Sequence, residues 1–393
     1  MKLPLPKCLV SMHSHGSALS GSSLILMAMV SALSPAAHAA DWFSMKDGDN
    51  FKRFSVSAGW LHGIPQGSAN NFTTDTALAE GTQAGVGAVT VDQVVNSVDT
   101  STPRAQVQQA VLQTAAATDL LGLFTFRDQN GTQFFNADTA GTAIINNLSS
   151  FASVGTGLTV DDIDTLGLTF NYNFTDNVSV QLIGGFPPVV DIAGQGQVFA
   201  PLRGSATPEG ILDLAGVLVG EFPITKDIFV TDLSSVETVA NARAWTPALE
   251  LQYQFGQSGV NKFRPYLGAG LMYGYFNELD INNSIEQDLI AAGDLVQNVR
   301  DDAAGRSLDD LPSSANSKVE LDASDAIGPI VSLGFTYDFA ENWFAVASVS
   351  YAKLSSDITI DVVNENDGVS LFTSKTEIDI DPVLTYLGVG YRF

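Results

Sequence analysis

The chain has 393 residues, and its 43 acidic residues against 18 lysines and arginines give a formal net charge of −25 at pH 7. This balance argues against a nucleic-acid partner, because nucleic-acid binding needs basic surface that neutralises phosphates. One cysteine and four histidines leave little material for thiol or zinc chemistry.

Residues 1–39 have the pattern of a cleavable secretory signal peptide. Lys2 and Lys7 precede the apolar stretch LILMAMVSAL at residues 24–33, and the small-residue motif AHA follows. We expect cleavage before Ala40 and export of residues 40–393 as a single domain. The apolar stretch is short for a membrane span, which disfavours the alternative of a retained anchor.

Cleavage would also remove Cys8 and every histidine except His62. No disulfide, thiol nucleophile or cysteine–histidine zinc site is then expected, and no cofactor. The rest of the chain has no apolar run of about 18 residues or more, the length that a membrane helix needs. If the protein spans a bilayer, it does so with strands closed into a barrel, because an open sheet edge would leave backbone groups unpaired in hydrocarbon.

Apolar and polar residues alternate with a period of two in eight segments, which predicts eight strands. The first is FSVSAGWL at residues 54–61, and three hairpins with short turns follow it. The predicted strands after the first are residues 166–174, 178–186, 249–255, 263–276, 331–339, 343–354 and 381–393.

The connections between these hairpins are all long, so short and long connections alternate strictly. The long connections cover about residues 63–163, 187–244, 277–324 and 361–378. This alternation and the even strand count indicate an all-β fold, an eight-stranded antiparallel transmembrane β-barrel with long extracellular loops. A soluble barrel of lipocalin type is the alternative, but its outward face should be rich in lysine and glutamate.

The loops are expected to be partly helical. Residues 104–123 look helical, residues 285–299 carry apolar side chains at helical spacing, and residues 211–220 form an apolar run. Two interpretations stay open: these stretches cap the barrel mouth and gather a substrate, or they bury one another in a loop subdomain.

Four segments resemble the OmpW family of small outer-membrane barrels. They are LGLTFNYNFTDNVSVQLIGGFP, WTPALELQYQF with KFRPYLGAGLMY, DFAENWFAVASVSYAKLSSD and the terminal DPVLTYLGVGYRF. The resemblance covers all eight strands and few loop residues, and the loops here are longer than the family usually carries.

The resemblance implies location in the outer membrane, among lipid and lipopolysaccharide. It also implies a passive channel that takes small hydrophobic molecules into the barrel lumen and releases them sideways into the membrane. Tyr391 and Phe393 in the last strand look like the signal that the outer-membrane assembly machinery recognises.

Strand parity predicts which side chains face the lumen, although a register slip of one residue would invert a strand. A filled core is the alternative to an open channel, because eight strands leave room for little more than side chains. The predicted lining of the path is Leu61, Ile183, Met272, Phe344, Val346, Leu384 and Tyr386. Near the short turns, a lower polar plug is predicted from Glu250, Gln252, Arg264 and Arg392.

Four prolines lie toward the long-loop ends of strands, where a missing backbone donor would open the wall. We interpret Pro187, Pro247, Pro329 and Pro382 as candidates for a lateral opening, and the alternative is that they only end strands.

Other chemistry has little support in the sequence. His62 has no partner in a catalytic motif, so no enzyme activity is expected. The pairs Asp301-Asp302 and Asp309-Asp310 and the group around Asp162 lack EF-hand spacing, so solvated acidic loops are the preferred interpretation over Ca²⁺ sites. The alternative function is a structural or adhesion barrel that acts through its acidic loops.

Overall fold

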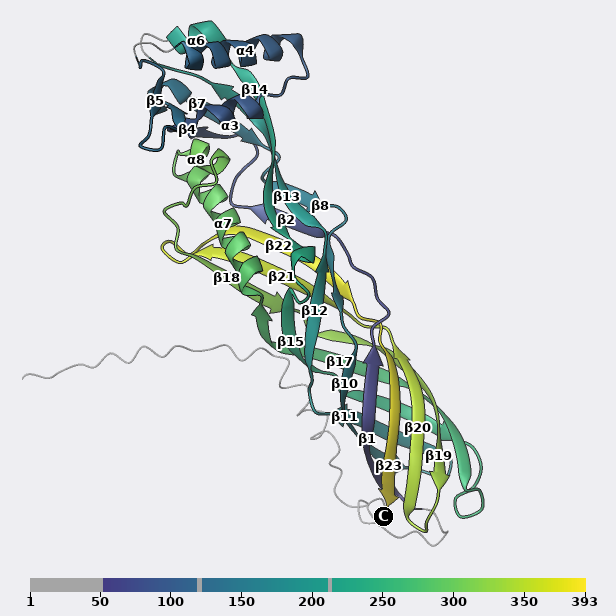
Figure 1. Cartoon of the computed structure of the whole chain (residues 1–393). Coiled ribbons are helices and arrows are strands. Elements are labelled where there is room, and N and C mark those ends of the chain that lie inside the picture. Colours follow the sequence, from purple (N-terminus) through teal and green to yellow (C-terminus); the bar gives the residue numbers. More distant parts are fainter. Residues whose placement is uncertain (1–51, 119–121, 211–213) are drawn as a thin grey trace, which may run out of the picture. The chain divides into compact units, whose positions relative to one another are not determined.

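The computed structural model describes residues 52–118, 122–210 and 214–393 (Figure 1). The predicted signal peptide at residues 1–39 lies outside the described residues, as do residues 119–121 of the predicted helix and residues 211–213 of the apolar run.

Eight strands form a closed antiparallel barrel, as predicted. They pair in the order β16-β11-β10-β1-β23-β20-β19-β17, and the pairing of β16 with β17 closes the circuit. The strands are β1 (Phe54–Ile64), β10 (Ile163–Asn173), β11 (Val178–Gly185), β16 (Ala248–Gln254), β17 (Phe263–Ile281), β19 (Ala326–Asp338), β20 (Trp343–Ala352) and β23 (Val383–Arg392).

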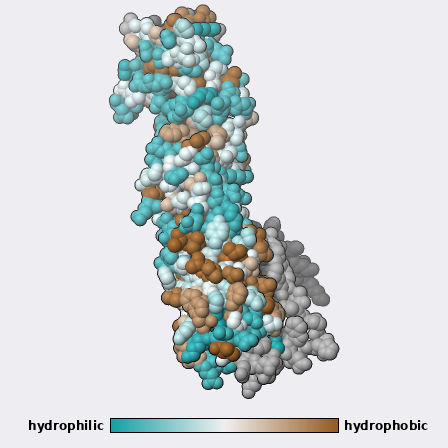
Figure 2. All heavy atoms as spheres, turned by 90° about the vertical axis from the view of Figure 1, so that its right-hand side faces the viewer, coloured by the Kyte–Doolittle hydropathy of each residue, from teal (hydrophilic) through white to brown (hydrophobic). Residues whose placement is uncertain are grey.

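The outer surface of the barrel is apolar because the period-two pattern places one residue class on each face. Leu251, Leu333 and Leu387 are each about 60% exposed, whereas their inward neighbours are buried. Apolar side chains gather over the barrel part of the face in Figure 2. A surface of this kind is stable in lipid and would aggregate in water, which excludes the soluble barrel.

Aromatic side chains form two belts around the barrel. Near the short turns, edge-to-face pairs join Tyr253 with Phe255 at 5.0 Å and Tyr391 with Trp343 at 5.1 Å, measured between ring centroids. Toward the long connections, the exposed rings are Trp60, Trp245, Tyr275 and Tyr351. Aromatic rings at both edges of an apolar band are typical of a barrel that crosses a membrane.

The long connections are more ordered than the sequence pattern indicated, because each of them contains β-strands. β15, β12 and β9 extend the barrel wall beyond β17, and three further sheets have the orders β14-β13-β7-β3, β18-β21-β22-β2-β8 and β4-β6-β5. Their strands are β2 (Phe72–Thr76), β3 (Thr82–Gly85), β4 (Val89–Thr90), β5 (Thr125–Arg127), β6 (Gln133–Phe135), β7 (Thr142–Asn146), β8 (Ser150–Ser153), β9 (Gly157–Val160), β12 (Val189–Gln195), β13 (Gln197–Thr207), β14 (Phe222–Asp232), β15 (Ala240–Trp245), β18 (Ser317–Ala323), β21 (Ser355–Asn364) and β22 (Val369–Asp379).

Helices occur in the first and third long connections, where they were expected, and also in the second, where the sequence showed only an apolar run. They are α3 (Val91–Ser97), α4 (Pro103–Ala117), α5 (Ala137–Ala140), α6 (Leu214–Val219), α7 (Asn283–Arg300) and α8 (Ala304–Leu308), with the 3-10 turn η2 (Leu233–Ser235). The Asn282 side chain caps α7 by accepting a hydrogen bond from the Ser284 amide at 3.0 Å. Among the helices of the described ranges, none has the length and apolar character that crossing a membrane requires.

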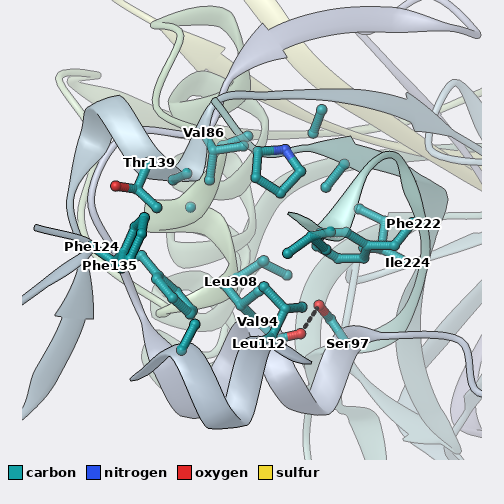
Figure 3. Close-up of a pocket in the computed structure, with 18 of the residues that line it drawn as sticks. Val86, Val94, Ser97, Leu112, Phe124, Phe135, Thr139, Phe222, Ile224 and Leu308 are labelled. Carbon is teal, nitrogen blue, oxygen red and sulfur yellow. Dashed lines mark hydrogen bonds between the residues drawn. The ribbon is translucent and has the colours of Figure 1, made fainter. Parts of the chain in front are cut away.

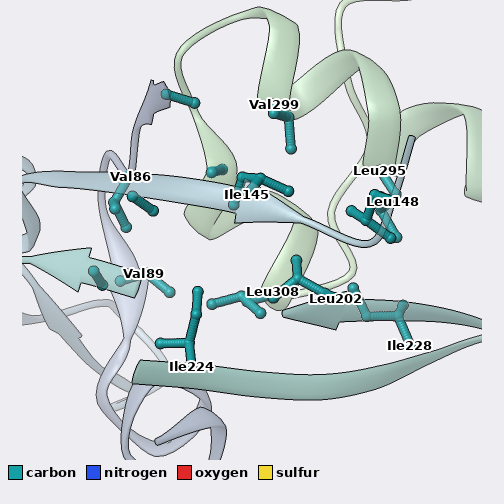
Figure 4. Packing of buried hydrophobic residues seen from close by; sticks show 14 of the residues in the cluster. Val86, Val89, Ile145, Leu148, Leu202, Ile224, Ile228, Leu295, Val299 and Leu308 are labelled. Carbon is teal, nitrogen blue, oxygen red and sulfur yellow. The ribbon is translucent and has the colours of Figure 1, made fainter. Parts of the chain in front are cut away.

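The long connections bury their apolar residues against one another. One cluster joins α3, α4, α7 and α8 to β7, β13 and β14, with Ile145, Leu202 and Leu308 among its members (Figure 4). A second cluster joins the inner face of α7, at Ile285 and Leu289, to β21 and β22. These contacts support the interpretation that the helical stretches bury one another in a loop subdomain.

Candidate functional site

The barrel lumen contains the side chains that strand parity placed there. Ser57, Thr169, Gln181, Glu250 and Tyr386 are each exposed by 8% or less. The strand ladders fix this orientation, because Ser57 lies opposite Thr169 on β10 and opposite Gly390 on β23. From the short turns upward, the lumen holds polar and aromatic side chains and then an apolar cavity.

Glu250 is the most buried charged residue of the lumen, with no exposed surface. Its Oε2 atom accepts hydrogen bonds from Ser332 Oγ at 2.5 Å and from Gln252 Nε2 at 3.4 Å. Gln252 also donates to Gln181 Oε1 at 2.6 Å. Glu250 Oε1 has no hydrogen-bond partner among the described residues. We call Glu250, Gln252, Gln181 and Ser332 the glutamate layer.

The two arginines of the predicted plug bond elsewhere, to acidic residues beside the short turns. Arg264 forms an ion pair with Asp176 at 3.3 Å and donates to the Asp176 carbonyl at 2.6 Å. Arg392 pairs with Asp338, and its guanidinium lies 4.3 Å from the ring centroid of Phe344.

The four residues of the predicted plug therefore lie in two separate layers. The reason is the strand register: Arg264 lies opposite Thr336, whereas Glu250 lies opposite Gly270, farther along β17. We call Arg264 and Arg392 with their acidic partners the arginine layer.

An aromatic layer fills the lumen between its two ends. Tyr266, Phe344, Val346 and Tyr386 form one buried cluster, and Leu61 packs against it. The Tyr386 hydroxyl lies 2.8 Å from Ser57 Oγ, within hydrogen-bond distance. Four residues of the predicted path, namely Leu61, Phe344, Val346 and Tyr386, thus belong to this layer.

Inward glycines make room for these rings. A Cβ atom on Gly334 would lie 2.6 Å from the Tyr266 ring, and one on Gly390 would lie 2.2 Å from the Phe344 ring. Tyr266 belongs to neither the predicted path nor the predicted plug. The pairing of an inward glycine with an inward aromatic on the next strand is the signal that would have found it.

Above these layers lies an apolar cavity of about 80 Å³. Met272 and Leu384 of the predicted path line it, together with Phe276, Leu354 and Ile380. Ile183 packs against the cluster that contains Met272 and Ile330, which adjoins the cavity. Only three residues of the predicted path, Ile183, Met272 and Leu384, thus lie at this level. We call this cavity the upper cavity.

The barrel wall beside the upper cavity is interrupted. The ladder between β11 and β16 ends at Ile183 and Ala248, and pairing resumes between Val189 on β12 and Arg243 on β15. Thr246, on the opposite side of the interruption, lines the upper cavity. We call this interruption, between residues 184–187 and 245–247, the seam.

Of the four prolines considered for a lateral opening, Pro187 and Pro247 flank the seam. The wall continues past the other two. Pro329 lies opposite Leu271, and its carbonyl accepts a hydrogen bond from the Lys353 amide at 3.0 Å. The Pro382 carbonyl accepts a hydrogen bond from the Ala352 amide at 3.1 Å. A proline has no backbone N–H donor but keeps its carbonyl acceptor, so the hydrogen-bonded strand pairing can continue past it.

The remaining polar candidates belong to structural contacts. His62 Nδ1 lies 2.9 Å from Asp164 Oδ1, and the His62 ring stacks on Trp60 at the upper aromatic belt. Asp309 accepts hydrogen bonds from the amide and hydroxyl of Thr90. Within residues 52–118, 122–210 and 214–393, no three His, Cys, Asp or Glu side chains are grouped to hold a metal ion.

Comparison with known proteins places this architecture among outer-membrane proteins. The family model described as "OmpW family" matches residues 121–292 and 310–393, more than half of the chain. Outer membrane protein W of Vibrio cholerae is 23% identical over 287 residues, which cover 73% of this chain and 100% of that protein. Outer membrane protein W of Escherichia coli is 24% identical over 281 residues, which cover 71% and 96% of the two chains.

The solved structure of the outer membrane protein OprG from Pseudomonas aeruginosa aligns with 16% identity and a TM-score of 0.43, covering 88% of this chain and 98% of that one.

Proposed function

Because this chain belongs to the OmpW family of outer-membrane β-barrel proteins, we propose that it is a passive channel for small hydrophobic molecules. The molecules enter the lumen from the side of the long connections and leave sideways into the membrane. With the barrel in the outer membrane, the long connections form the extracellular part and the short turns face the periplasm.

The observation that carries the proposal is the position of the upper cavity beside the seam. An apolar solute in this cavity contacts Met272, Leu384 and other apolar side chains. Each ~100 Å² of apolar surface removed from water stabilises the bound solute by roughly 2 to 3 kcal/mol. Thr246 lines the cavity at the seam, so the distance from the bound solute to the lipid is short.

The route straight down the lumen is unfavourable for the same solute. It leads past the glutamate layer, where the carboxylate of Glu250 is buried. Separating that carboxylate from Ser332 and Gln252 would leave buried polar groups unpaired, at a cost of about 1 to 3 kcal/mol for each group. The difference between the two routes favours lateral release at the seam.

Two further parts of the proposal concern biogenesis. We propose that residues 1–39 are removed as a signal peptide during export. We also propose that Tyr391 and Phe393 are recognised by the outer-membrane assembly machinery. Tyr391 pairs with Trp343 in the periplasmic aromatic belt, where the end of an unpaired strand would be accessible before the barrel closes.

A structural or adhesion barrel remains the second candidate, and one observation favours it. The extracellular connections fold into packed sheets with two apolar clusters of their own. Ordered, acidic extracellular sheets suit a role in surface contact. This candidate predicts no solute flux, so one measurement separates the two functions.

That measurement is uptake of an alkane or a monoterpene into liposomes that contain the protein. Ile183→Trp places a large ring beside Met272 at the floor of the upper cavity. Leu182→Trp is the matched control, because Leu182 is 50% exposed on the lipid face. We expect Ile183→Trp to abolish protein-dependent uptake and Leu182→Trp to preserve it. Absence of uptake with the unmodified protein would contradict the channel.

A further inference from the structure

A second apolar cavity, of about 70 Å³, lies in the extracellular connections (Figure 3). It is enclosed by α3, α4, α6 and α8 with β6, β7, β13 and β14. Phe124 and Phe135 lie together on one side of it, and Phe222 and Ile224 lie on the other. We call it the distal cavity.

The lining of the distal cavity has almost no polar groups that could hydrogen-bond to a water molecule. Ser97 and Thr139 are the polar side chains among its described lining residues. Ser97 Oγ already donates to the Val94 carbonyl at 2.8 Å. A buried water needs two to four polar partners, and apolar cavities without them stay dry and bind small apolar molecules.

The distal cavity opens to the surface between α4 and α6. Leu218 lines it and yet is 57% exposed. On α4, Val111 and Ala115 line it and are partly exposed. Val107 and Val217 add exposed apolar surface on the same two helices. An apolar molecule can therefore reach the cavity from outside without passing through the folded core.

The distal cavity is separate from the lumen. Its walls belong to the cluster around Leu202 and Leu308, which has no residue in common with the two lumen clusters. α3, α4 and α8 lie outside the residues that the family model matches. Segments outside the family match thus complete a cavity whose other walls, including β6, β7, β13 and β14, lie inside it.

We propose that the distal cavity is a binding site for a small aliphatic hydrocarbon, held outside the membrane. The cavity takes one short aliphatic chain against Leu112, Phe135 and Ile224, with the mouth at Leu218. Binding is driven by removal of apolar surface from water and needs no charged or hydrogen-bonding group on the ligand.

The test uses the full chain in lipid nanodiscs, with methyl-labelled alanine and hexane as the probe. The methyl groups of Ala143 and Ala206 line the distal cavity and report on its occupancy by NMR. We expect saturable shifts of these two signals on addition of hexane. Partitioning of hexane into lipid produces no saturable shift at these positions, because both residues are buried in the distal cavity.

Matched variants on one helix identify the site. Ala115→Leu projects into the distal cavity and fills it, whereas Ala110→Leu adds the same group at an exposed position of α4. Alanine and leucine are both good helix formers, so neither substitution should weaken α4 through its helix propensity. We expect Ala115→Leu to weaken hexane binding by at least about tenfold, equivalent to ~1.4 kcal/mol, and Ala110→Leu to leave it unchanged. Leu218→Gln, at the exposed mouth, should weaken binding even if Ala115→Leu perturbs folding.

The lumen variant Ile183→Trp should leave the distal shifts unchanged, which separates this site from the channel. Absence of saturable shifts in the unmodified protein would overturn the proposal. Shifts of equal affinity in Ala115→Leu and Leu218→Gln would overturn it as well.

Discussion

Ser332 on β19 donates a 2.5 Å hydrogen bond to Glu250 on β16, across strand β17, which lies between them in the barrel wall. The bond passes over Gly268. A Cβ atom at that position would lie 2.4 Å from Ser332 Oγ and 2.5 Å from Glu250 Oε2. One inward glycine therefore permits the bond that closes this level of the lumen.

Gly268→Ala should consequently destabilise the barrel. The added methyl group must displace Ser332 or Glu250, and overpacking of this kind costs about 1 to 3 kcal/mol. Urea unfolding in detergent, followed by the shift between folded and unfolded electrophoretic mobility, measures the effect. Gly184→Ala is the control, because a Cβ atom there meets nothing within 4 Å. Equal midpoints for the two variants would contradict the packing described at Gly268.

Removal of Asp176 should destabilise the arginine layer. Its partner Arg264 is 3% exposed, and an uncompensated buried charge costs about 3 to 5 kcal/mol. We expect a loss near the lower end of that range for Asp176→Ala, because the Asp176, Phe255 and Gly256 carbonyls still accept from Arg264.

The same unfolding assay provides the comparison. Asp227→Ala removes the partner of Arg203 on the extracellular surface, where side chains are 38% and 59% exposed. An exposed pair contributes about 1 kcal/mol or less. A loss from Asp176→Ala no larger than that from Asp227→Ala would show that Asp176 does not stabilise the arginine layer.

Thr246→Trp should slow solute release. Thr246 lines the upper cavity at the seam, so an indole there obstructs the exit while leaving the extracellular entrance free. We expect uptake into liposomes to fall by at least about tenfold, which corresponds to ~1.4 kcal/mol in the barrier. Ile327→Trp, at a residue 71% exposed on the barrel exterior, is the control. Unchanged uptake in Thr246→Trp would place the exit elsewhere.

The stability of the extracellular part should depend on the protonation of Lys226. Burial lowers the pKa of Lys226, and nearby Asp310 and Asp309 partly oppose this. The lysine donates to Gln93 Oε1 at 2.8 Å and to the Leu308 carbonyl at 2.9 Å. A lowered folded-state pKa means that the unfolded state holds the proton more tightly.

Stability should therefore rise as the pH increases through the folded-state pKa of Lys226 toward its ordinary value of 10.5. Comparison with Lys226→Met isolates this group from other residues that titrate in the same range. We expect the unmodified protein to gain stability relative to the variant as the pH rises toward 10.5, measured by urea midpoints. A relative loss over that rise in pH would contradict the burial of the ammonium group.

The barrel strands could be predicted because each carries its own period-two pattern and needs no information about its partners. The extracellular strands were assigned to loops although some alternate as well. In β21, Ile358, Ile360 and Val362 point into a core, but this strand pairs with β18 and β22 in a sheet outside the barrel. The eight predicted strands already accounted for the alternation of short and long connections. The sequence pattern therefore gave no reason to assign more strands.

The inward residues could be predicted from parity, but their grouping could not. Whether Arg264 meets Glu250 depends on the stagger between β16 and β17, which a single strand's sequence does not contain. The seam could not be predicted from the sequence for the same reason. Pro247 and Pro329 are alike in sequence, and only the pairing of their neighbours distinguishes an interrupted wall from a continuous one.

The most direct test of lateral release is photo-crosslinking of a diazirine-labelled alkane to the protein in nanodiscs, with the labelled residues identified by mass spectrometry. Lateral release predicts labels on Met272 and Leu384 in the upper cavity and on Thr246 and Phe186 at the seam. Labels on Asn171 or Gln254, which line the polar cavity around Arg264, would show passage down the lumen and contradict it.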